Sequence, residues 1–241
     1  MVLFIGGIGL VGFVATRLFG AGHGLVVTGL VGGLASSTAV TFTMARRAKE
    51  NPALVCSCAL AIVGASCVML VRVLIAATLL FPALGVRIGA ALVVMFAVSL
   101  LAAWPLMRGA RAESKASAAV DVKNPFELKS AFVFGLAFAV VILLSKFLRA
   151  TFGDSALYLA ALVAGLTDVD AITLSTANLA KDGLSLSLAA GVILTACLSN
   201  TFVKIAIGWS TGGRALGQQL ARIFGAMLAA GIVAVVVSAL L

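Results

Sequence analysis

The sequence predicts an all-α polytopic membrane protein of about eight transmembrane helices. We expect these as two four-helix repeats with interrupted helices near the membrane midplane. Three observations lead to this fold class. The composition is too apolar for a soluble domain, the apolar residues fall into segments of membrane-spanning length, and one stretch of the first half recurs in the second half.

The composition alone indicates an integral membrane protein, whose partner is the lipid bilayer. Hydrophobic residues make up 63% of the 241 residues and charged residues only 10%, whereas a soluble domain carries about 25% charged residues. The mean hydropathy is +1.23. The net charge of +9 does not indicate a nucleic-acid partner, because the basic residues lie in loops and near helix ends, as in membrane proteins.

Eight segments are long enough to cross the hydrocarbon core, for which a helix needs about 20 apolar residues. We expect these spans at roughly 2–19, 25–45, 53–78, 86–105, 129–149, 156–179, 184–208 and 218–240. Turn-forming residues separate them, among them Asn51-Pro52, Pro82, Lys181-Asp182-Gly183 and Ser210-Thr211-Gly212-Gly213.

The longest polar stretch, 107–128, predicts a cytoplasmic linker between a first repeat at 1–106 and a second repeat at 129–241. Arg46, Lys49 and Lys181 fall on the same side of the membrane as this linker. Because cytoplasmic loops are enriched in Lys and Arg, that side is predicted to be cytoplasmic, and both termini with it.

Residues 161–177 repeat residues 29–45 at an offset of 132 residues. Duplication of one unit is how many transporters are built. Four helices per unit would make the two repeats parallel. A miscount of one span would make them inverted instead.

The two copies differ in charge where Ser36 and Thr38 of the first are replaced by Asp168 and Asp170 of the second. Carboxylates at membrane depth cost roughly 2.5–3.5 kcal/mol each on insertion scales, so they are functional candidates. Residues two apart on an α-helix project about 200° from one another, so both cannot face one ligand from a regular helix. We therefore expect an interruption, with Thr167-Asp168 as the N-cap of a second half-helix.

Gly33 and Gly165 precede the two motifs and are the expected points at which the helices break. Broken helices near the midplane expose backbone carbonyls and amides, and transporters bind their substrates there. Asp168 lies about 12 residues into its span, roughly 18 Å deep at 1.5 Å per residue, which is near the bilayer centre.

Carboxylates, hydroxyls and backbone oxygens together form a site that suits a hard cation such as Mg²⁺ or Mn²⁺. The expected ligands of such a divalent cation are Asp168, Asp170, Thr167, Ser36, Ser37, Thr38, Asn200 and Ser199. Cys67 is the counterpart of Ser199 in the first repeat, and a thiol ligand would shift the preference towards Mn²⁺, Co²⁺ or Zn²⁺. Packing alone explains Cys67 equally well.

The same 132-residue shift superimposes Arg72 on Lys204. Both lie about one turn inside the membrane, where we expect them to serve gating or charge balance. An anionic substrate is a weaker alternative, because half-helix N-termini attract anions but the identifiable midplane charges are acidic. Close helix packing and local hydrogen bonds are the structural alternative for the Ser and Thr residues.

Two runs carry a resemblance to a known family: Gly-Gly-Leu-Ala-Ser-Ser-Thr-Ala-Val-Thr at 32–41 and Gly-Leu-Thr-Asp-Val-Asp-Ala-Ile-Thr at 165–173. With Asn124-Pro125-Phe126-Glu127-Leu128 and Ser145-Lys146-Phe147, the chain resembles the bacterial membrane domain of unknown function found C-terminal to MgtC/SapB domains. The resemblance covers almost the whole chain. It implies the bacterial cytoplasmic membrane, and its magnesium-linked neighbour mildly favours divalent cations.

The sequence carries no nucleophile–base set, no phosphate-binding loop and no His-rich metal motif, so we expect neither an enzyme nor an organic cofactor. The leading hypothesis is a transporter or channel for a divalent metal cation that works as a homodimer. The alternative is a non-transporting membrane scaffold or regulatory subunit that partners an MgtC/SapB-type protein.

Overall fold

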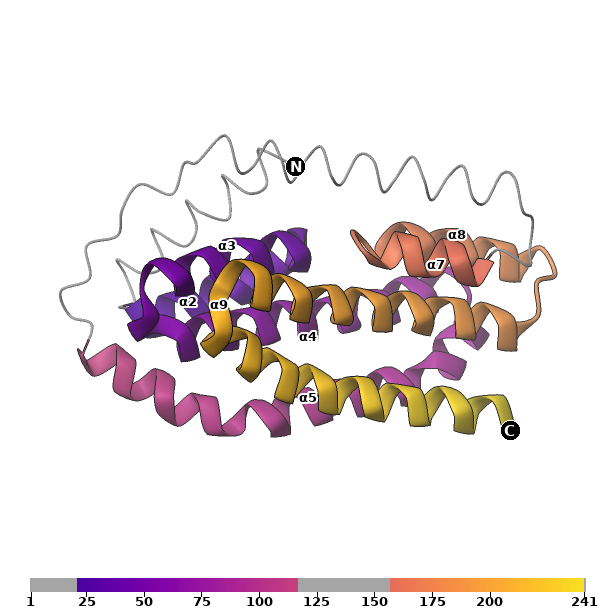
Figure 1. Cartoon of the computed structure of the whole chain (residues 1–241). Coiled ribbons are helices and arrows are strands. Elements are labelled where there is room, and N and C mark those ends of the chain that lie inside the picture. The colour runs from indigo at the N-terminus through magenta and orange to yellow at the C-terminus, as the bar shows by residue number, and fades with distance from the viewer. Residues whose placement is uncertain (1–20, 117–156, 241) are drawn as a thin grey trace. The chain divides into compact units, whose positions relative to one another are not determined.

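The computed structural model describes residues 21–116 and 157–240, which form helices joined by short turns (Figure 1). In chain order these are α2 (Ala21–Ala35), α3 (Ser37–Glu50), the 3-10 helix η1 (Pro52–Leu54), α4 (Val55–Leu80), α5 (Pro82–Ala116), α7 (Leu157–Gly165), α8 (Asp170–Lys181) and α9 (Leu186–Leu240). No strand occurs within the described ranges. The expected all-α class is confirmed for this part of the chain.

Three of the described helices are long and apolar enough to cross a membrane, over Pro52–Leu80, Pro82–Arg111 and Leu186–Ala234. The expected spans 2–19 and 129–149 lie outside the described residues. The count of eight spans therefore stays a prediction.

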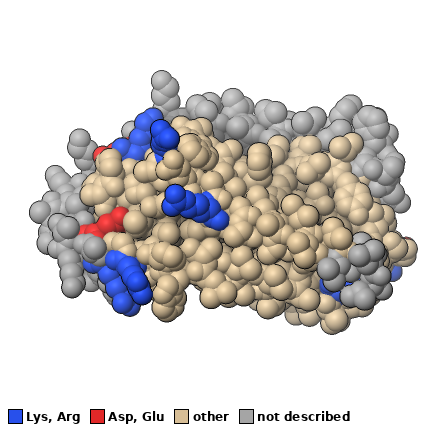
Figure 2. All heavy atoms as spheres, turned by 60° about the horizontal axis from the view of Figure 1, so that its bottom comes forward, with Lys and Arg blue, Asp and Glu red and all other residues tan. Residues whose placement is uncertain are grey.

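The described helices carry large apolar side chains on their outer surface. Leu79, Val86 and Leu101 are 80%, 81% and 73% exposed. Most of the described surface on the face drawn in Figure 2 is uncharged. Extensive exposed apolar surface is uncommon in soluble monomers and suits contact with lipid.

The expected spans 25–45 and 156–179 are each divided into two short helices. α2 ends at Ala35 and α3 begins at Ser37, whereas α7 ends at Gly165 and α8 begins at Asp170. The interruption predicted in each repeat is confirmed. Its depth in the membrane stays a prediction.

Proline sets the boundaries around α4 and α5, because it has no N–H with which to continue a preceding helix. Pro52 opens η1 after α3, and Pro82 opens α5 directly after α4. α5 then continues past Pro105 to Ala116. Residues 107–116 of the stretch expected as a linker are therefore helical.

The expected spans 184–208 and 218–240 are joined in α9, which bends at Gly213. The φ of Gly213 is 83° and its ψ is 177°, a conformation that residues with a Cβ rarely adopt. The bend falls within the turn predicted at 210–213. The two helical segments of α9 therefore meet at Gly213 without a loop.

The chain forms two compact units. The described parts of unit 1 are 21–69, 99–116 and 204–225, and those of unit 2 are 70–98, 157–203 and 226–240. Neither unit is a sequence half, because each combines segments of both expected repeats. Under the 132-residue shift, residues 25–69 of unit 1 fall on 157–201 of unit 2. Each unit thus contains one interruption and the start of the helix that follows it.

Candidate functional site

The interruption in unit 2 is closed by hydrogen bonds to all four carbonyls of the last turn of α7. An α-helix leaves these groups without intrahelical partners. The Oγ of Ser199 donates to the carbonyl of Leu162 at 2.7 Å, and Nδ2 of Asn200 donates to that of Gly165 at 2.8 Å. Backbone N–H groups of the next turn donate to the two carbonyls between them. Ser199 and Asn200, expected as metal ligands, thus stabilise the broken helix end.

Asp168 stabilises the first turn of α8. Its Oδ1 accepts a hydrogen bond from the backbone N–H of Asp170 at 3.0 Å, and its side chain is half-buried. The carboxylate satisfies one free N–H group of the helix start and lies at the positive end of the helix dipole, which typically contributes about 0.3–1 kcal/mol. The expected N-cap pair Thr167-Asp168 is wrong, because the N-cap of α8 is Val169, which makes no side-chain capping hydrogen bond. Thr167 donates its hydroxyl to the carbonyl of Ala164 at 3.1 Å.

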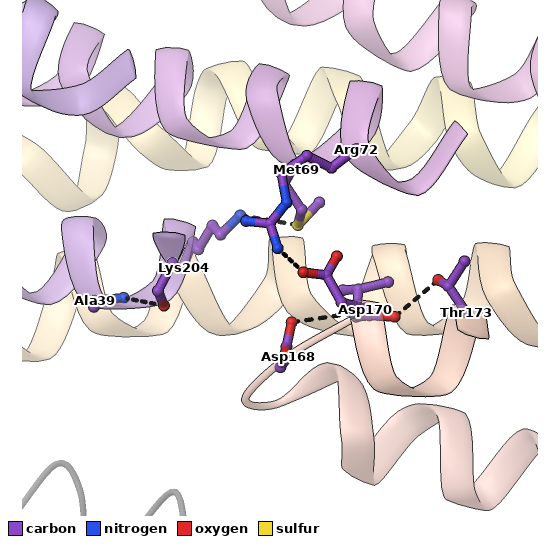
Figure 3. A network of polar contacts seen from close by, with 9 residues as sticks. Ala39, Met69, Arg72, Asp168, Asp170, Thr173 and Lys204 are labelled. Atoms are coloured by element: carbon purple, nitrogen blue, oxygen red, sulfur yellow. Dashed lines mark hydrogen bonds and ion pairs between the residues drawn. The ribbon is translucent and has the colours of Figure 1, made fainter. Parts of the chain in front are cut away.

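Asp170, the first residue of α8, forms an ion pair with Arg72 of α4 (Figure 3). The two side chains are 25% and 29% exposed. One of the two carboxylates of the motif therefore has a guanidinium partner. A role of Arg72 in gating or charge balance stays a prediction.

The interruption in unit 1 is shorter, a single residue between α2 and α3, and that residue is a side-chain N-cap. Ser36 has extended backbone angles (φ −163°, ψ 109°), and its Oγ accepts a hydrogen bond from the backbone N–H of Ala39 at 3.2 Å. The buried residues Ser37 and Thr38 follow in the first turn of α3. Ser36 is the N-cap of α3, whereas its counterpart Asp168 lies one residue before Val169, the N-cap of α8. Both side chains nevertheless accept a backbone N–H from the first turn of the helix that follows.

Lys204 lies in unit 1 and is completely buried. Its Nζ donates to the Oγ of Ser66 at 3.1 Å. It also lies 3.4 Å from the Sδ of Met69 (Figure 3). Neither contact residue was singled out by the sequence, although a hydroxyl in the apolar α4 segment is a signal that points to Ser66. Lys204 and its counterpart Arg72 thus take up different environments.

Gly33 and Gly165 do not break their helices through unusual backbone angles, because among the described glycines only Gly183 and Gly213 have a positive φ. They are instead points of close helix contact. A Cβ on Gly33 would lie 2.7 Å from the Cα of Ala65, and one on Gly165 would lie 2.8 Å from the Cβ of Ser199. Both glycines allow the first half-helix to approach the next long helix.

The thiol of Cys67 is buried in unit 1, where its Sγ lies 3.3 Å from the Oγ of Ser99. The described residues contain no group of three or more His, Cys, Asp or Glu side chains that could hold a metal ion. A cation at the acidic motif would therefore depend on two carboxylates together with hydroxyl and backbone oxygens.

The expected site residues are distributed over both units. Unit 2 brings together Gly165, Thr167, Asp168, Asp170, Ser199, Asn200 and Arg72. Unit 1 contains Gly33, Ser36, Ser37, Thr38, Cys67 and Lys204. The acidic cluster of unit 2, which we define as Asp168, Asp170 and Arg72, is the strongest candidate site, because it carries three charges at an interrupted helix.

Comparison with known proteins gives a family without an assigned activity. The family described as "Domain of unknown function (DUF4010)" matches residues 3–212. An uncharacterized protein of Aquifex aeolicus (strain VF5) is 32% identical over 181 residues, which cover 75% of this chain and 79% of that protein. No solved structure matches.

Proposed function

We propose that this chain, which belongs to the family of the domain of unknown function DUF4010, is a membrane transporter or channel for a divalent metal cation. The proposed ion site is the acidic cluster of unit 2. A single observation carries the proposal: a carboxylate that accepts the first N–H of α8 and an ion-paired carboxylate lie two residues apart at a helix interruption. We propose the bacterial cytoplasmic membrane as its location and a homodimer as its assembly.

The first support is the cost of these charges in an apolar setting. Stabilising a helix start requires only a Ser, as Ser36 shows in unit 1. Unit 2 uses an aspartate at the same position and adds a second aspartate at the counterpart of Thr38. Ionisable residues within membrane segments are costly and usually serve transport, so a replacement of hydroxyls by carboxylates favours an ion pathway.

The second support is the chemistry of the oxygen atoms. Oδ1 of Asp168 accepts one backbone hydrogen bond, and an ionised carboxylate has roughly four acceptor positions. Its remaining acceptor positions, the carboxylate of Asp170 and the hydroxyl oxygen of Thr167 are hard donors of the kind that Mg²⁺ and Mn²⁺ prefer. Such ions retain several water ligands, which reduces the number of protein ligands required.

Binding of a dication would compete with Arg72 for Asp170. The acidic cluster carries two negative charges and one positive charge, so a dication gains from both carboxylates but is repelled by the guanidinium at the same place. We infer that Arg72 moves away from Asp170 when the ion binds. Such a rearrangement would couple occupancy of the site to a change of conformation, as transport requires.

The ion pair also favours a second candidate function. Each carboxylate of the acidic cluster already has a structural partner, a helix N–H for Asp168 and a guanidinium for Asp170. In a non-transporting scaffold or regulatory subunit, for example one that binds an MgtC/SapB-type protein, the two aspartates would serve only to stabilise the fold through these contacts. Such a protein would neither bind nor move metal ions.

Metal flux into proteoliposomes separates the two candidates. We expect Mn²⁺ or Mg²⁺ uptake by the unaltered chain and its loss in Asp168→Asn and in Asp170→Asn. The matched control is Asp182→Asn, because Asp182 is an exposed carboxylate at the end of α8. Unchanged flux in both cluster variants would exclude this site, and no flux by the unaltered chain would favour the scaffold.

Thermal unfolding provides an independent measure of binding. A ligand that binds only the folded state stabilises it by RT ln(1 + [L]/Kd), about 2.7 kcal/mol at 100 times Kd. We expect Mn²⁺ to raise the Tm of the unaltered chain and of Asp182→Asn, but not that of Asp168→Asn. An equal shift in all three proteins would place the metal elsewhere.

A further inference from the structure

A pocket of about 420 Å³ lies in unit 1, and none of the residues expected to bind the metal cation lines it. It is lined by Phe42, Arg46, Lys49, Glu50, Ser210 and Thr211. The first four belong to α3 and the last two to α9. The pocket therefore lies where the end of α3 meets the bend of α9.

The sequence explains why the pocket forms at this place. The four residues of α3 are spaced i, i+4, i+7 and i+8, so they share one face of the helix. The two helices approach closely beside the pocket, since a Cβ on Gly212 would lie 3.3 Å from the Cα of Ala45. Gly213 then bends α9 away through its positive φ. Ser210 and Thr211, the α9 residues of the pocket, lie directly before this close approach and bend.

The pocket carries more positive than negative charge. Its cations are Arg46 and Lys49, and its anion is Glu50. The NH2 atom of Arg46 and the Oε1 of Glu50 are 3.7 Å apart, and the two side chains are 26% and 63% exposed. An i,i+4 pair of this kind typically contributes only about 0.3–0.5 kcal/mol.

The polar groups on α9 complement an anionic group that carries hydroxyls. Ser210 donates its hydroxyl hydrogen to the carbonyl of Ala206 at 2.8 Å, so its oxygen can only accept from a ligand. A ligand that carries a hydroxyl or ammonium donor beside its anionic group would complement this acceptor.

We propose that this pocket binds a phosphate group, either the phosphodiester of an anionic lipid headgroup or free inorganic phosphate. Arg46 and Lys49 would hold the phosphate oxygens, with Ser210 accepting from a headgroup hydroxyl. The volume is within the roughly 300–1,000 Å³ of small-molecule sites. Basic pockets between membrane helices commonly bind lipid headgroups. The inference does not rest on the proposed ion transport.

The repeat supplies an internal comparison. Under the 132-residue shift Arg46 corresponds to Asn178, Lys49 to Lys181 and Glu50 to Asp182. The second copy thus keeps one cation and one anion and lacks the second cation. Lys181 is exposed, like Lys49, and also lies in the last turn of its helix. Lys181→Gln is therefore a matched control for removal of Lys49.

The test titrates the purified full chain in detergent with three probes and follows its Tm. The probes are dioctanoyl phosphatidylglycerol, dioctanoyl phosphatidylcholine and inorganic phosphate, the last against chloride at equal ionic strength. Two basic groups at about 1 kcal/mol each correspond to a roughly 30-fold weakening. We expect that loss in Arg46→Gln with Lys49→Gln, and wild-type binding in Lys181→Gln and in the charge-preserving pair Arg46→Lys with Lys49→Arg.

Each outcome has one meaning. Binding of phosphatidylglycerol alone, with this variant pattern, identifies a lipid headgroup, and binding of inorganic phosphate with the same pattern identifies the free ion. Equal binding of phosphatidylglycerol and phosphatidylcholine, equal binding in all variants, or no binding of any probe overturns the proposal. The charge-preserving pair reports whether a loss arises from charge or from misfolding.

Discussion

The ion pair between Arg72 and Asp170 supports a quantitative prediction. Asp170→Asn removes the carboxylate that neutralises a guanidinium only 29% exposed. Breaking a fully buried pair destabilises by about 3–5 kcal/mol, and the partial exposure of both side chains reduces the expected loss to about 2–3 kcal/mol. In a chain of this size, such a loss lowers the Tm by roughly 4–12 °C.

A double-mutant cycle isolates the contribution of the pair. The variant that combines Arg72→Gln with Asp170→Asn carries neither charge. We therefore expect its loss of unfolding free energy to be smaller than the sum of the losses in the two single variants. Residues in contact typically couple by about 0.5–3 kcal/mol, and here we expect at least about 1 kcal/mol. The assay is thermal unfolding of the four proteins in one detergent, with Asp182→Asn as the exposed control.

The result that would refute this reasoning is additivity. If the two single losses add within about 0.5 kcal/mol in the double variant, the contact does not stabilise the fold. Asp170 would then be available to an ion without competition from Arg72. The inferred movement of Arg72 during transport would lose its basis.

Three further predictions concern the helix ends and contacts, each measured by thermal unfolding. Asp168→Ala should lose about 1 kcal/mol with the hydrogen bond to the Asp170 N–H, whereas Asp168→Asn should keep that stability because an Asn side chain accepts the same bond; equal losses would show that this hydrogen bond does not stabilise the start of α8. Gly165→Ala should cost about 1–3 kcal/mol through overpacking against α9, whereas Gly225→Ala, with nothing within 4 Å, should be neutral or stabilising. Glu113→Gln should cost about 1–2 kcal/mol, because its carboxylate accepts three hydrogen bonds at the start of α4, and exposed Glu50→Gln should not; matching losses would show that this cap is unimportant.

Glu113 is a structural residue that the predicted boundary between the first repeat and the linker did not reveal. It lies in the stretch that the sequence predicts as a linker, because charge and low hydropathy there are typical of a loop. In the structure α5 continues through this stretch, and Glu113 accepts from the N–H groups of Cys56 and Ser57. Composition shows that this stretch is polar. It does not show that Glu113 uses its charge to cap α4 from a distant position in the sequence, so that the stretch can be both polar and helical.

The acidic motif shows how far local reasoning extends. A spacing of two residues is incompatible with one ligand on a regular helix, and this geometric argument predicted the interruption that the structure contains. The same argument assigned both carboxylates to one cation. It did not identify Arg72 as the partner of Asp170, because the pairing joins residues 98 positions apart, 170 minus 72, on helices that only folding brings together.

The polar residues of α9 make the same point. Ser199 and Asn200 were expected to face an ion, because hydroxyl and amide groups are rare in apolar spans. They donate instead to the carbonyls of Leu162 and Gly165. An interrupted helix creates unsatisfied carbonyls in an environment without water, and side chains of the neighbouring helix must supply the missing donors.

The sequence by itself determined the properties that depend on neighbouring residues: helical class, membrane-compatible composition, the turns at proline and glycine, and the two interruptions. These follow from hydropathy, proline chemistry and helix periodicity, which act over one or two turns. Only the tertiary structure decided which charges neutralise one another, which donors close the broken helix ends and where α3 and α9 leave a pocket. Those features arise between distant segments, where burial in an apolar surrounding makes an unsatisfied polar group costly and therefore selects its partner.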